Sequence, residues 1–468
     1  MVFDKVFERF VASCPACVMF RALMEHIFAP GKLDALFHRA AKKQYTRELL
    51  FSTLVELISQ VVTRTSKSVH AAYKDARAEI PVTVRALYDK LSHIEPSTSR
   101  ALVQHVAKEA NDLIERTDGC CKRLLKGYRV RILDGNHLGK TEHRLGVLRG
   151  TAAGALPGQC LVLLDPRRMV VDDIFPCEDG HAQERSLLTD VLPTIQPRDL
   201  VIADRNFCTL AFLCALMGRR AKFIIRQHGR MPWKPLKKPR LIGHSETGLV
   251  YEQQIEVRDP ATGETKRLRR VTVKLKKPTR DGDPEIHVLT NLPASRVSAV
   301  DVAKLYQERW TLEAAFNELT LHLRCELNTL GYPKAALFAF CVAVCCYNLL
   351  ATIKGAMRGA HGEDVMKNNV SSYFLTDEIN SNYKGMMVAL PPEEWTAFQA
   401  LTTTTVAAHL KRWARGMDLG NYPKHTRGPK KPATRRPNAK FQHVSTWKLL
   451  QERSQQQRNK RKYACAST

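Results

Sequence analysis

The stretch YRVRILDGNH (residues 128–137) decides the fold together with LVIADRNF (residues 200–207), which follows the same pattern. In each, a short apolar run typical of a buried strand ends on an aspartate, Asp134 or Asp204. If the two strands are neighbours in one sheet, both carboxylates lie at the same edge. Two unpaired carboxylates repel each other, so we expect a cation to join them, and such oxygen ligands suit Mg²⁺. The alternative is that both aspartates only begin turns.

The segments around these runs predict a mixed α/β sheet. QCLVLL (159–164) and MVVDDIF (169–175) flank the turn residues 165–168, which indicates an antiparallel hairpin. FCTLAFLCALM (207–217) suits a buried helix, and AKFIIR (221–226) suits another strand. Antiparallel strands followed by alternating helix and strand are typical of a mixed sheet.

Residues 228–285 interrupt this pattern with a basic, turn-rich stretch. It contains RMPWKPLKK, with Trp233, Lys237 and Lys238, and two strand-like runs around DPATG (259–263), so we expect a β-rich insertion. EIHVLTNL (285–292) then returns to strand. Ser298, with Asp301 three residues later, predicts the cap of a helix from Ala299 to about Leu323.

That helix carries three polar residues at helical spacing. Tyr306, Arg309 and Glu313 are three and then four residues apart, so they share one helical face. Placed over the strand ends, Glu313 would be a third metal ligand and Arg309 a bidentate phosphate clamp. The alternative is an Arg–Glu pair on a solvated face, which leaves the two strand-end aspartates unexplained.

The flanking regions are expected to be helical. Residues 1–120 have apolar residues at helical spacing and a basic cast, which predicts a helical DNA-binding domain or a simple helical cap. The catalytic region is expected over 121–353, and a helical C-terminal region over 354–423. Residues 424–468 contain thirteen Lys or Arg and one acid, Glu452, which predicts a flexible basic tail.

Composition indicates a globular protein with a polyanionic partner. The 468 residues are 44% hydrophobic and 25% charged, and 73 Lys+Arg against 46 Asp+Glu give a net charge of +27. Such an excess favours nucleic acid, although a merely basic surface is the alternative. The thirteen cysteines are too sparse for a disulfide scaffold, and MVFDKVFERF lacks the layout of a signal peptide. The uncharged run 335–353 is expected to be a buried core helix, so no membrane is expected.

The spacing Tyr306-x2-Arg309-x3-Glu313, following ILDG and IADR, resembles the DDE transposases of insertion-sequence family four. The resemblance covers roughly residues 125–350, including the β-rich insertion and the YNLL stretch (347–350). It implies a ribonuclease H-like core with the YREK-type signature of that family. Asp134, Asp204 and Glu313 would then be catalytic residues that hold two Mg²⁺ or Mn²⁺ ions.

The resemblance also implies the reaction and its partners. The expected activity is cut-and-paste transposition, with phosphodiester hydrolysis at the element ends followed by strand transfer from the 3′-hydroxyl. The partners would be double-stranded DNA, as terminal inverted repeats and target, with a homodimer assembled on DNA in the prokaryotic cytoplasm, associated with the nucleoid. Tyr306, Arg309, Lys237 and Lys238 would contact DNA. Trp233 would stack on a flipped base, although it could equally pack its own hairpin.

One position departs from the family pattern. The signature lysine falls on Thr320, and Arg324, one turn further on the predicted helix, could substitute for it. Two other classes of function therefore stay open. A catalytically silent, transposase-derived DNA-binding protein is favoured by Thr320, and a stand-alone ribonuclease H-like nuclease is disfavoured by the helical N-terminal region.

The remaining motifs are weaker. Cys14 and Cys17 have zinc-knuckle spacing without a second pair of ligands. His137 follows Asp134 and could contact substrate, and His181 and Glu184 precede Asp204 and could lie near the site. Phosphate-loop and serine-nucleophile motifs do not stand out, so ATP dependence is not indicated.

Overall fold

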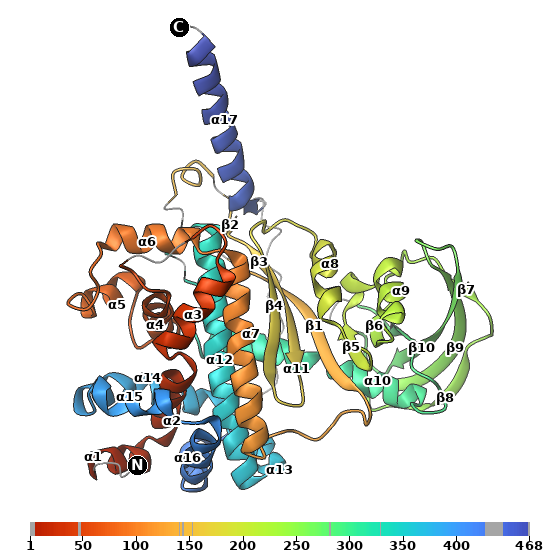
Figure 1. Cartoon of the computed structure of the whole chain (residues 1–468). Coiled ribbons are helices and arrows are strands. Elements are labelled where there is room, and N and C mark those ends of the chain that lie inside the picture. The colour runs from red at the N-terminus through yellow and green to blue at the C-terminus, as the bar shows by residue number, and fades with distance from the viewer. Residues whose placement is uncertain are drawn as a thin grey trace.

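A computed structural model describes residues 5–466 except 45–47, 140, 143–144, 152, 280–281, 328 and 426–442, and it leaves the side chains of 460–466 undescribed. Two parts are apparent, a helical lobe and a large sheet, with two long helices lying between them (Figure 1). The prediction of a mixed α/β protein preceded by a helical region is confirmed. The predicted boundary of a flexible tail at 424 cannot be compared directly, because 426–442 lie outside the described residues.

The first helices form the lobe. They are α1 (Lys5–Ser13), α2 (Pro15–Ile27), α3 (Pro30–Ala40), α4 (Phe51–Val62), α5 (Val69–Asp75), α6 (Val84–His93) and α7 (Pro96–Arg116). Cys14 and Cys17 are buried where α1 meets α2. Among the described residues no three His, Cys, Asp or Glu side chains form a metal-binding group, so the structure gives the zinc hypothesis no support.

The main sheet has the strand order β4-β3-β1-β5-β6-β11-β10-β9-β7, with β8 also paired to β9. Its strands are β1 (Arg129–His137), β3 (Gln159–Asp165), β4 (Val170–Cys177), β5 (Asp199–Ala203), β6 (Lys222–Arg226), β7 (Lys234–Pro235), β8 (Arg240–His244), β9 (Gly248–Arg258), β10 (Thr265–Leu275) and β11 (Glu285–Thr290). β1, β5 and β6 run parallel to one another, β3 is antiparallel to β1, and β4 is antiparallel to β3. The segment 228–285, expected to be a β-rich insertion, contains β7, β8, β9 and β10, and these strands continue the main sheet through β11.

Successive side chains along each strand point to opposite faces of the sheet, and so they enter two different cores. Ile132 and Val162 face the core shared with the helical lobe, whereas Leu133 and Leu163 face a smaller core covered by α8 (Leu188–Val191) and α9 (Leu210–Gly218). Helices thus cover both faces of the parallel strands.

Helix α12 (Pro333–His361) runs beside α7 and is the central helix of the larger core (Figure 1). By length and composition α12 could cross a membrane, but its apolar stretch is entirely buried inside the protein. This burial agrees with the expectation of a core helix for 335–353. Four further helices pack around the lobe, namely α13 (Glu363–Asn369), α14 (Ser372–Ala389), α15 (Pro392–Ala400) and α16 (Thr403–Arg415).

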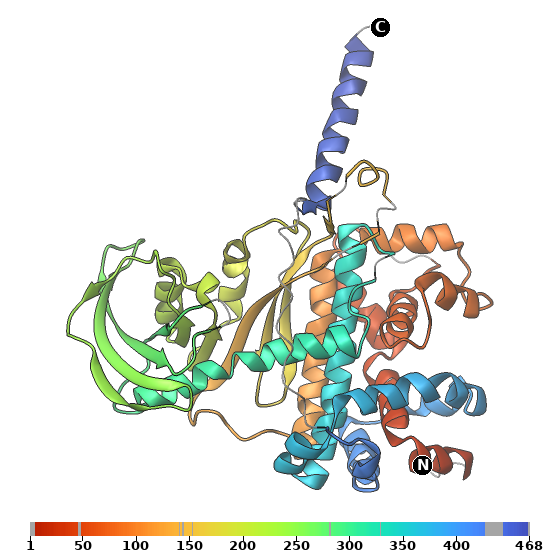
Figure 2. The same cartoon turned by 180° about the vertical axis from the view of Figure 1, so that it is seen from behind.

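The helix predicted over 299–323 is two helices. α10 (Ala299–Gln307) begins at the predicted Ser298 cap, whose hydroxyl accepts from the Asp301 N–H at 3.1 Å, and α11 (Trp310–Leu321) follows after a break at 308–309. Together they run across the sheet towards α12 (Figure 2).

The C-terminal segment contains a short strand and a helix within residues 444–466. Strand β12 (Val444–Ser445) pairs in parallel with β2 (Ala155–Leu156), and α17 (Thr446–Ala466) projects from this point away from the rest of the protein (Figure 1). The Ser445 hydroxyl donates to Asp179 at 2.6 Å, which anchors the base of α17.

Candidate active site

Asp134 and Asp204 lie side by side at one edge of the parallel sheet. β1 and β5 pair in parallel register up to Leu133 and Ala203, and each aspartate is the next residue. Ile132 and Ile202 both face the larger core, so the aspartates two residues further on point to that same face. The structure thus brings the two carboxylates together as the strand patterns predict.

α10 and α11 bring Tyr306 and Arg309 onto these carboxylates. The Tyr306 hydroxyl donates to Asp204 Oδ1 at 3.3 Å, and Arg309 Nη1 donates to Asp134 Oδ2 at 3.1 Å. The backbone between the helices tightens into i→i+3 hydrogen bonds, from Arg309 N to Tyr306 O and from Leu312 N to Arg309 O. Short 3₁₀ stretches within helices are often found at functional hinges. Here the tightened turn lies at Arg309 itself.

Glu313 reaches the site through Arg309. The arginine forms one ion pair with Asp134 and another, at 2.6 Å, with Glu313 Oε1. In this conformation the guanidinium links Asp134 to Glu313, and among the described residues no group of three metal-binding side chains is found. Metal binding by the three carboxylates stays a prediction. The Glu313 side chain is 48% exposed, compared with 19% for Asp134.

Burial disfavours the charged form of the Asp134 carboxyl. Burial raises its pKa to about 6, and the nearby Asp204 and Glu184 charges act in the same direction, against the lowering effects of Arg309 and the Gly135 amide. Burial and the Asp204 charge also raise the pKa of Tyr306, which keeps its phenol a neutral hydrogen-bond donor. Paired carboxylates whose charge is under-neutralised suit a hard divalent cation in donor type and in charge.

Glu184 is a fourth acid beside the site, on the other face of β1. A Cβ at Gly135 would lie 2.0 Å from Glu184 Oε1, so residue 135 has to be a glycine for this carboxylate to approach the strand. Glu184 accepts from Asn206 at 3.3 Å and lies 3.9 Å from His137 Nδ1. The sequence named His137 and Glu184 as neighbours of the site, and the structure places them there. His181 is exposed, and its N–H donates to the Asp179 carboxylate.

Arg324 does not lie where the sequence predicted. α11 ends at Leu321, so Arg324 is outside the helix, and its guanidinium donates to the Lys67 carbonyl at 2.6 Å. Thr320 is on α11 and donates to the Phe316 carbonyl. The expectation of a replacement cation one turn further along the same face is therefore wrong, because the helix unwinds before it reaches that residue.

The predicted DNA-contacting residues of the insertion are not brought to this edge. Trp233 packs against the smaller core, with the Arg270 guanidinium 4.9 Å from its ring centroid. Lys237 and Lys238 are exposed between β7 and β8, at the far end of the sheet order from β1. The geometry thus favours the hairpin-packing alternative for Trp233.

One aromatic residue at the site was missed. Trp310 directly follows Arg309 in the first turn of α11, and 55% of it is exposed, an unusual fraction for a tryptophan. The sequence signal was its position between Arg309 and Glu313 on a helix that otherwise has most of its apolar residues at least partly buried. The sequence analysis did not single it out, and the structure shows it exposed.

Comparisons with known proteins agree with this geometry. Residues 125–349 match the family model described as "Transposase DDE domain", and this range includes Asp134, Asp204, Tyr306, Arg309 and Glu313. A protein of Sinorhizobium fredii (strain NBRC 101917 / NGR234) named "Putative transposase y4zB" is 29% identical over 152 residues, which is 32% of this chain. The match spans 41% of the length of that relative.

A comparison of structures finds a cryo-EM structure of the piggyBac transposase synaptic complex with hairpin DNA. The TM-score is 0.42 and the sequence identity is 9%, with 90% of this chain and 88% of that chain covered. The family match rests on sequence, and it covers the strands and helices that form the carboxylate edge. Residues 125–349 of this chain therefore match a transposase DDE domain.

Proposed function

We propose that this protein is a DNA transposase of the insertion-sequence family four type, with a ribonuclease H-like core, and that the β1–β5 edge is its active site. The observation that carries the proposal is the convergence of Tyr306 and Arg309, from separate helices, onto Asp134 and Asp204. Residues of two helices and two parallel strands meet at one edge with the spacing of the YREK-type signature.

Each residue of the site has a role in this proposal. Asp134, Asp204 and Glu313 hold Mg²⁺ or Mn²⁺, two ions in all, which would activate the attacking oxygen and stabilise the leaving oxygen of a phosphodiester. Tyr306 orients the Asp204 carboxylate through its hydroxyl. Arg309 neutralises Asp134 and Glu313 in the resting protein and turns its planar fork to a DNA phosphate when the ions bind.

The partners follow from the same proposal. The substrates would be the terminal inverted repeats of the element and a target duplex, bound by a homodimer that assembles on DNA in a prokaryotic cytoplasm. Trp310 would stack on a base displaced at the cleavage point; it is exposed and follows Arg309 directly in the sequence.

A specific observation keeps a second candidate, a catalytically silent DNA-binding protein. Thr320 stands where the signature has lysine, and Arg324 is engaged by the Lys67 carbonyl. Neither residue supplies a free cation beside Glu313 in this conformation. The two candidates differ in cleavage and agree in DNA binding.

The test uses the full-length protein and linear duplexes that carry the genomic DNA flanking its gene. With Mg²⁺ or Mn²⁺ and without ATP, we expect nicks at the element ends, whereas Ca²⁺ should support binding with less cutting. Asp134→Asn is the matched negative control. Tight binding of these ends without cleavage under any divalent metal would overturn the transposase and favour the silent protein.

A further inference from the structure

A basic surface lies at the amino ends of β1 and β5, at the opposite end of these strands from the carboxylate edge. Two hollows, of about 230 Å³ and about 290 Å³, share Gly127 and Tyr128 as a common wall. Five residues from Arg129 to Asp134 at about 3.3 Å each place this surface about 17 Å along the strand from the active site. The two sites are therefore separate.

The lining of the hollows is rich in cations. Lys126, Arg198 and Arg296 line one hollow, and the basic residues of the other are Arg123, Arg129, Arg167 and Arg168. The loops that carry them are joined by hydrogen bonds, from Arg129 N to Arg198 O at 3.1 Å and from Arg198 N to Arg220 O at 3.3 Å. The basic residues thus form one continuous surface, which we call the amino-end surface.

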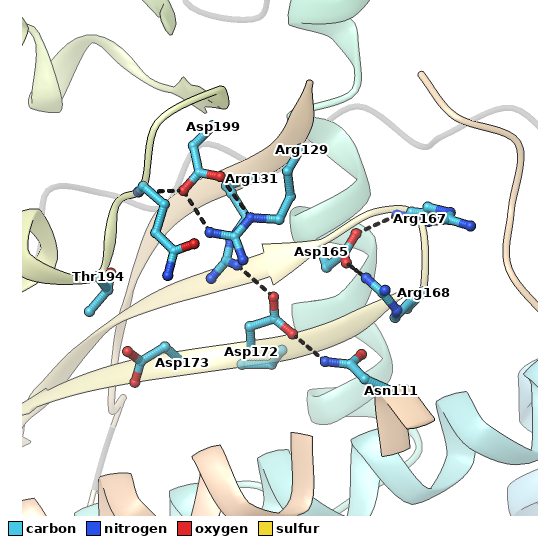
Figure 3. Close-up of polar contacts among 12 residues, drawn as sticks. Asn111, Arg129, Arg131, Asp165, Arg167, Arg168, Asp172, Asp173, Thr194 and Asp199 are labelled. Carbon is cyan, nitrogen blue, oxygen red and sulfur yellow. Dashed lines mark hydrogen bonds and ion pairs between the residues drawn. The ribbon is translucent and has the colours of Figure 1, made fainter. Parts of the chain in front are cut away.

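The acids of this region are already neutralised. Asp199 accepts a bidentate pair of hydrogen bonds from Arg129 at 2.7 and 2.8 Å, and Asp165 pairs with Arg168 (Figure 3). Figure 3 also shows the Arg167 guanidinium directed away from Asp165. The bond between these two residues comes from the Arg167 backbone N–H, which donates to the Asp165 carboxylate. Within the described part of the chain no ion pair engages the cations Arg123, Lys126, Arg167, Arg198 and Arg296.

Arg198 lies in a tight turn with φ 68°, in the left-handed region where glycine or asparagine is the usual residue. Met169, in the β3–β4 turn of the same edge, has φ 61°, so the conformation belongs to the turns and not to the charge of the side chains.

We infer that the amino-end surface binds the phosphate backbone of a second segment of duplex DNA, distinct from the segment at the carboxylate edge; the inference rests on the proposed function for the identity of the polyanion. The cations lie on turns, and among the described residues no helix projects from the surface into a groove, so the interactions read phosphates and not bases. The amino-end surface and the carboxylate edge lie at opposite ends of β1 and β5, and a duplex that is stiff over about 150 base pairs does not bend round the sheet from one end to the other.

The test is the salt dependence of binding to a 30-base-pair duplex without element ends. The variant combines Arg123→Gln, Lys126→Gln, Arg198→Asn and Arg296→Gln, with asparagine chosen because it tolerates positive φ. Every cation withdrawn from a phosphate should reduce the slope of log K against log[salt] by about 0.9, so we expect a reduction of about two to four in the slope and at least about tenfold weaker binding at 0.1 M salt.

The matched control removes the same charge from exposed positions on α1, α7, α13 and α16, by Arg9→Gln, Lys108→Gln, Lys367→Gln and Arg415→Gln. It should retain the wild-type slope and bind within threefold of wild type. Equal behaviour of the two quadruple variants, with both folded by circular dichroism, would overturn the inference.

Failure of the proposed function is separately visible. Wild-type protein that binds duplex with the expected slope but never cleaves element ends contradicts the transposase and leaves the amino-end surface supported. Wild-type protein that cleaves ends while the first quadruple variant keeps its full salt slope contradicts the amino-end surface alone.

Discussion

The two ends of β1 can be compared by how their acids are neutralised. At the amino end, Asp199 has Arg129 and Asp172 has Arg131 at 2.8 Å, each as its own arginine (Figure 3). Asp165 shares Arg168 with Glu115 and accepts a further hydrogen bond from the Arg167 backbone N–H. At the carboxyl end, Arg309 alone pairs with both Asp134 and Glu313, while Asp204 has the neutral Tyr306 hydroxyl.

This difference separates structural acids from functional ones. A carboxylate with its own arginine is neutral as a pair and contributes to the fold. Asp134 and Glu313 share one arginine and Asp204 beside them has none, so this edge keeps an excess of negative charge. Burial is the main cause of the raised pKa of Asp134, as it is for Asp172, and the Asp204 and Glu184 charges add to it at Asp134. The excess is what a cation-binding site requires, and the predictions below test it from the largest effect to the smallest.

The largest effect is expected from the carboxyl-end acids. Asp134→Asn, Asp204→Asn and Glu313→Gln should each reduce DNA-end cleavage by about 10³-fold or more, because each removes a charge needed to hold a metal ion. End binding should change less than threefold, since the basic surface is intact. Single-turnover cleavage and a gel-shift titration measure the two quantities. Residual cleavage within tenfold of wild type in all three variants would contradict the assignment.

An amino-end acid should affect stability and not chemistry. Asp172→Asn leaves the buried Arg131 without its ion-pair partner, which should lower the free energy of unfolding by about 3 kcal/mol. Arg131→Met combined with Asp172→Leu should recover most of that loss, because no buried charge is left unpaired. Urea unfolding checks both, and a cleavage rate per folded molecule that falls tenfold in Asp172→Asn would remove the distinction between the two ends.

The two tryptophans should also differ, with Trp310 affecting DNA binding and Trp233 affecting stability. Trp310→Ala should weaken binding of element ends by about 1–3 kcal/mol because a stacking partner is removed, with an unchanged melting temperature, because the ring is exposed. Trp233→Ala should lower the melting temperature and leave binding close to wild type, because that ring packs on the core. The reverse pattern would restore Trp233 as the stacking residue.

A smaller effect is expected from pH. Burial raises the pKa of Asp134 from 3.8 to about 6, so between these values the folded protein holds a proton that the unfolded chain has released. The contribution of this group to the free energy of unfolding is thus fully present below pH 3.8, decreases as the pH rises to about 6, and stays low above that pH. Asp134→Asn removes this dependence, so its stability relative to wild type should increase by about 1 kcal/mol between about pH 5 and pH 7. Urea unfolding in EDTA measures it, and a constant difference in stability between the two pH values would refute the raised pKa of Asp134.

The sequence predicted the edge better than the helix above it. Asp134 and Asp204 were found because each ends an apolar run, a local pattern that parallel pairing converts into proximity. The break at Arg309 was not predicted, since the apolar spacing continues through it, and the interruption depends on interactions with Asp134 and Glu313. Glu184 could only be named as a neighbour, because its approach to Gly135 is set by loop packing and not by local sequence.

The outer elements were harder still. β10 pairs with the next strand, β11, and the pairing of β11 with the distant β6 joins the 228–285 segment to the main sheet. Such long-range register has no local signal. Arg324 was predicted to continue the face of a helix that in fact ends at Leu321. Its backbone N–H instead donates to the end of α4 and its guanidinium to the α4–α5 connection. Both differences arise from tertiary interactions that override periodicity.

The central claim is that the excess negative charge at the Asp134–Asp204 edge binds a divalent cation, and its most direct test is anomalous diffraction from crystals of the protein soaked in Mn²⁺. We expect an anomalous peak between the Asp134 and Asp204 carboxylates, with the Arg309 guanidinium moved off Asp134, and no peak at the Asp165, Asp172 and Asp199 pairs. A peak at the amino-end pairs, or an empty carboxyl-end edge with Arg309 still bound to Asp134 at saturating Mn²⁺, would contradict it.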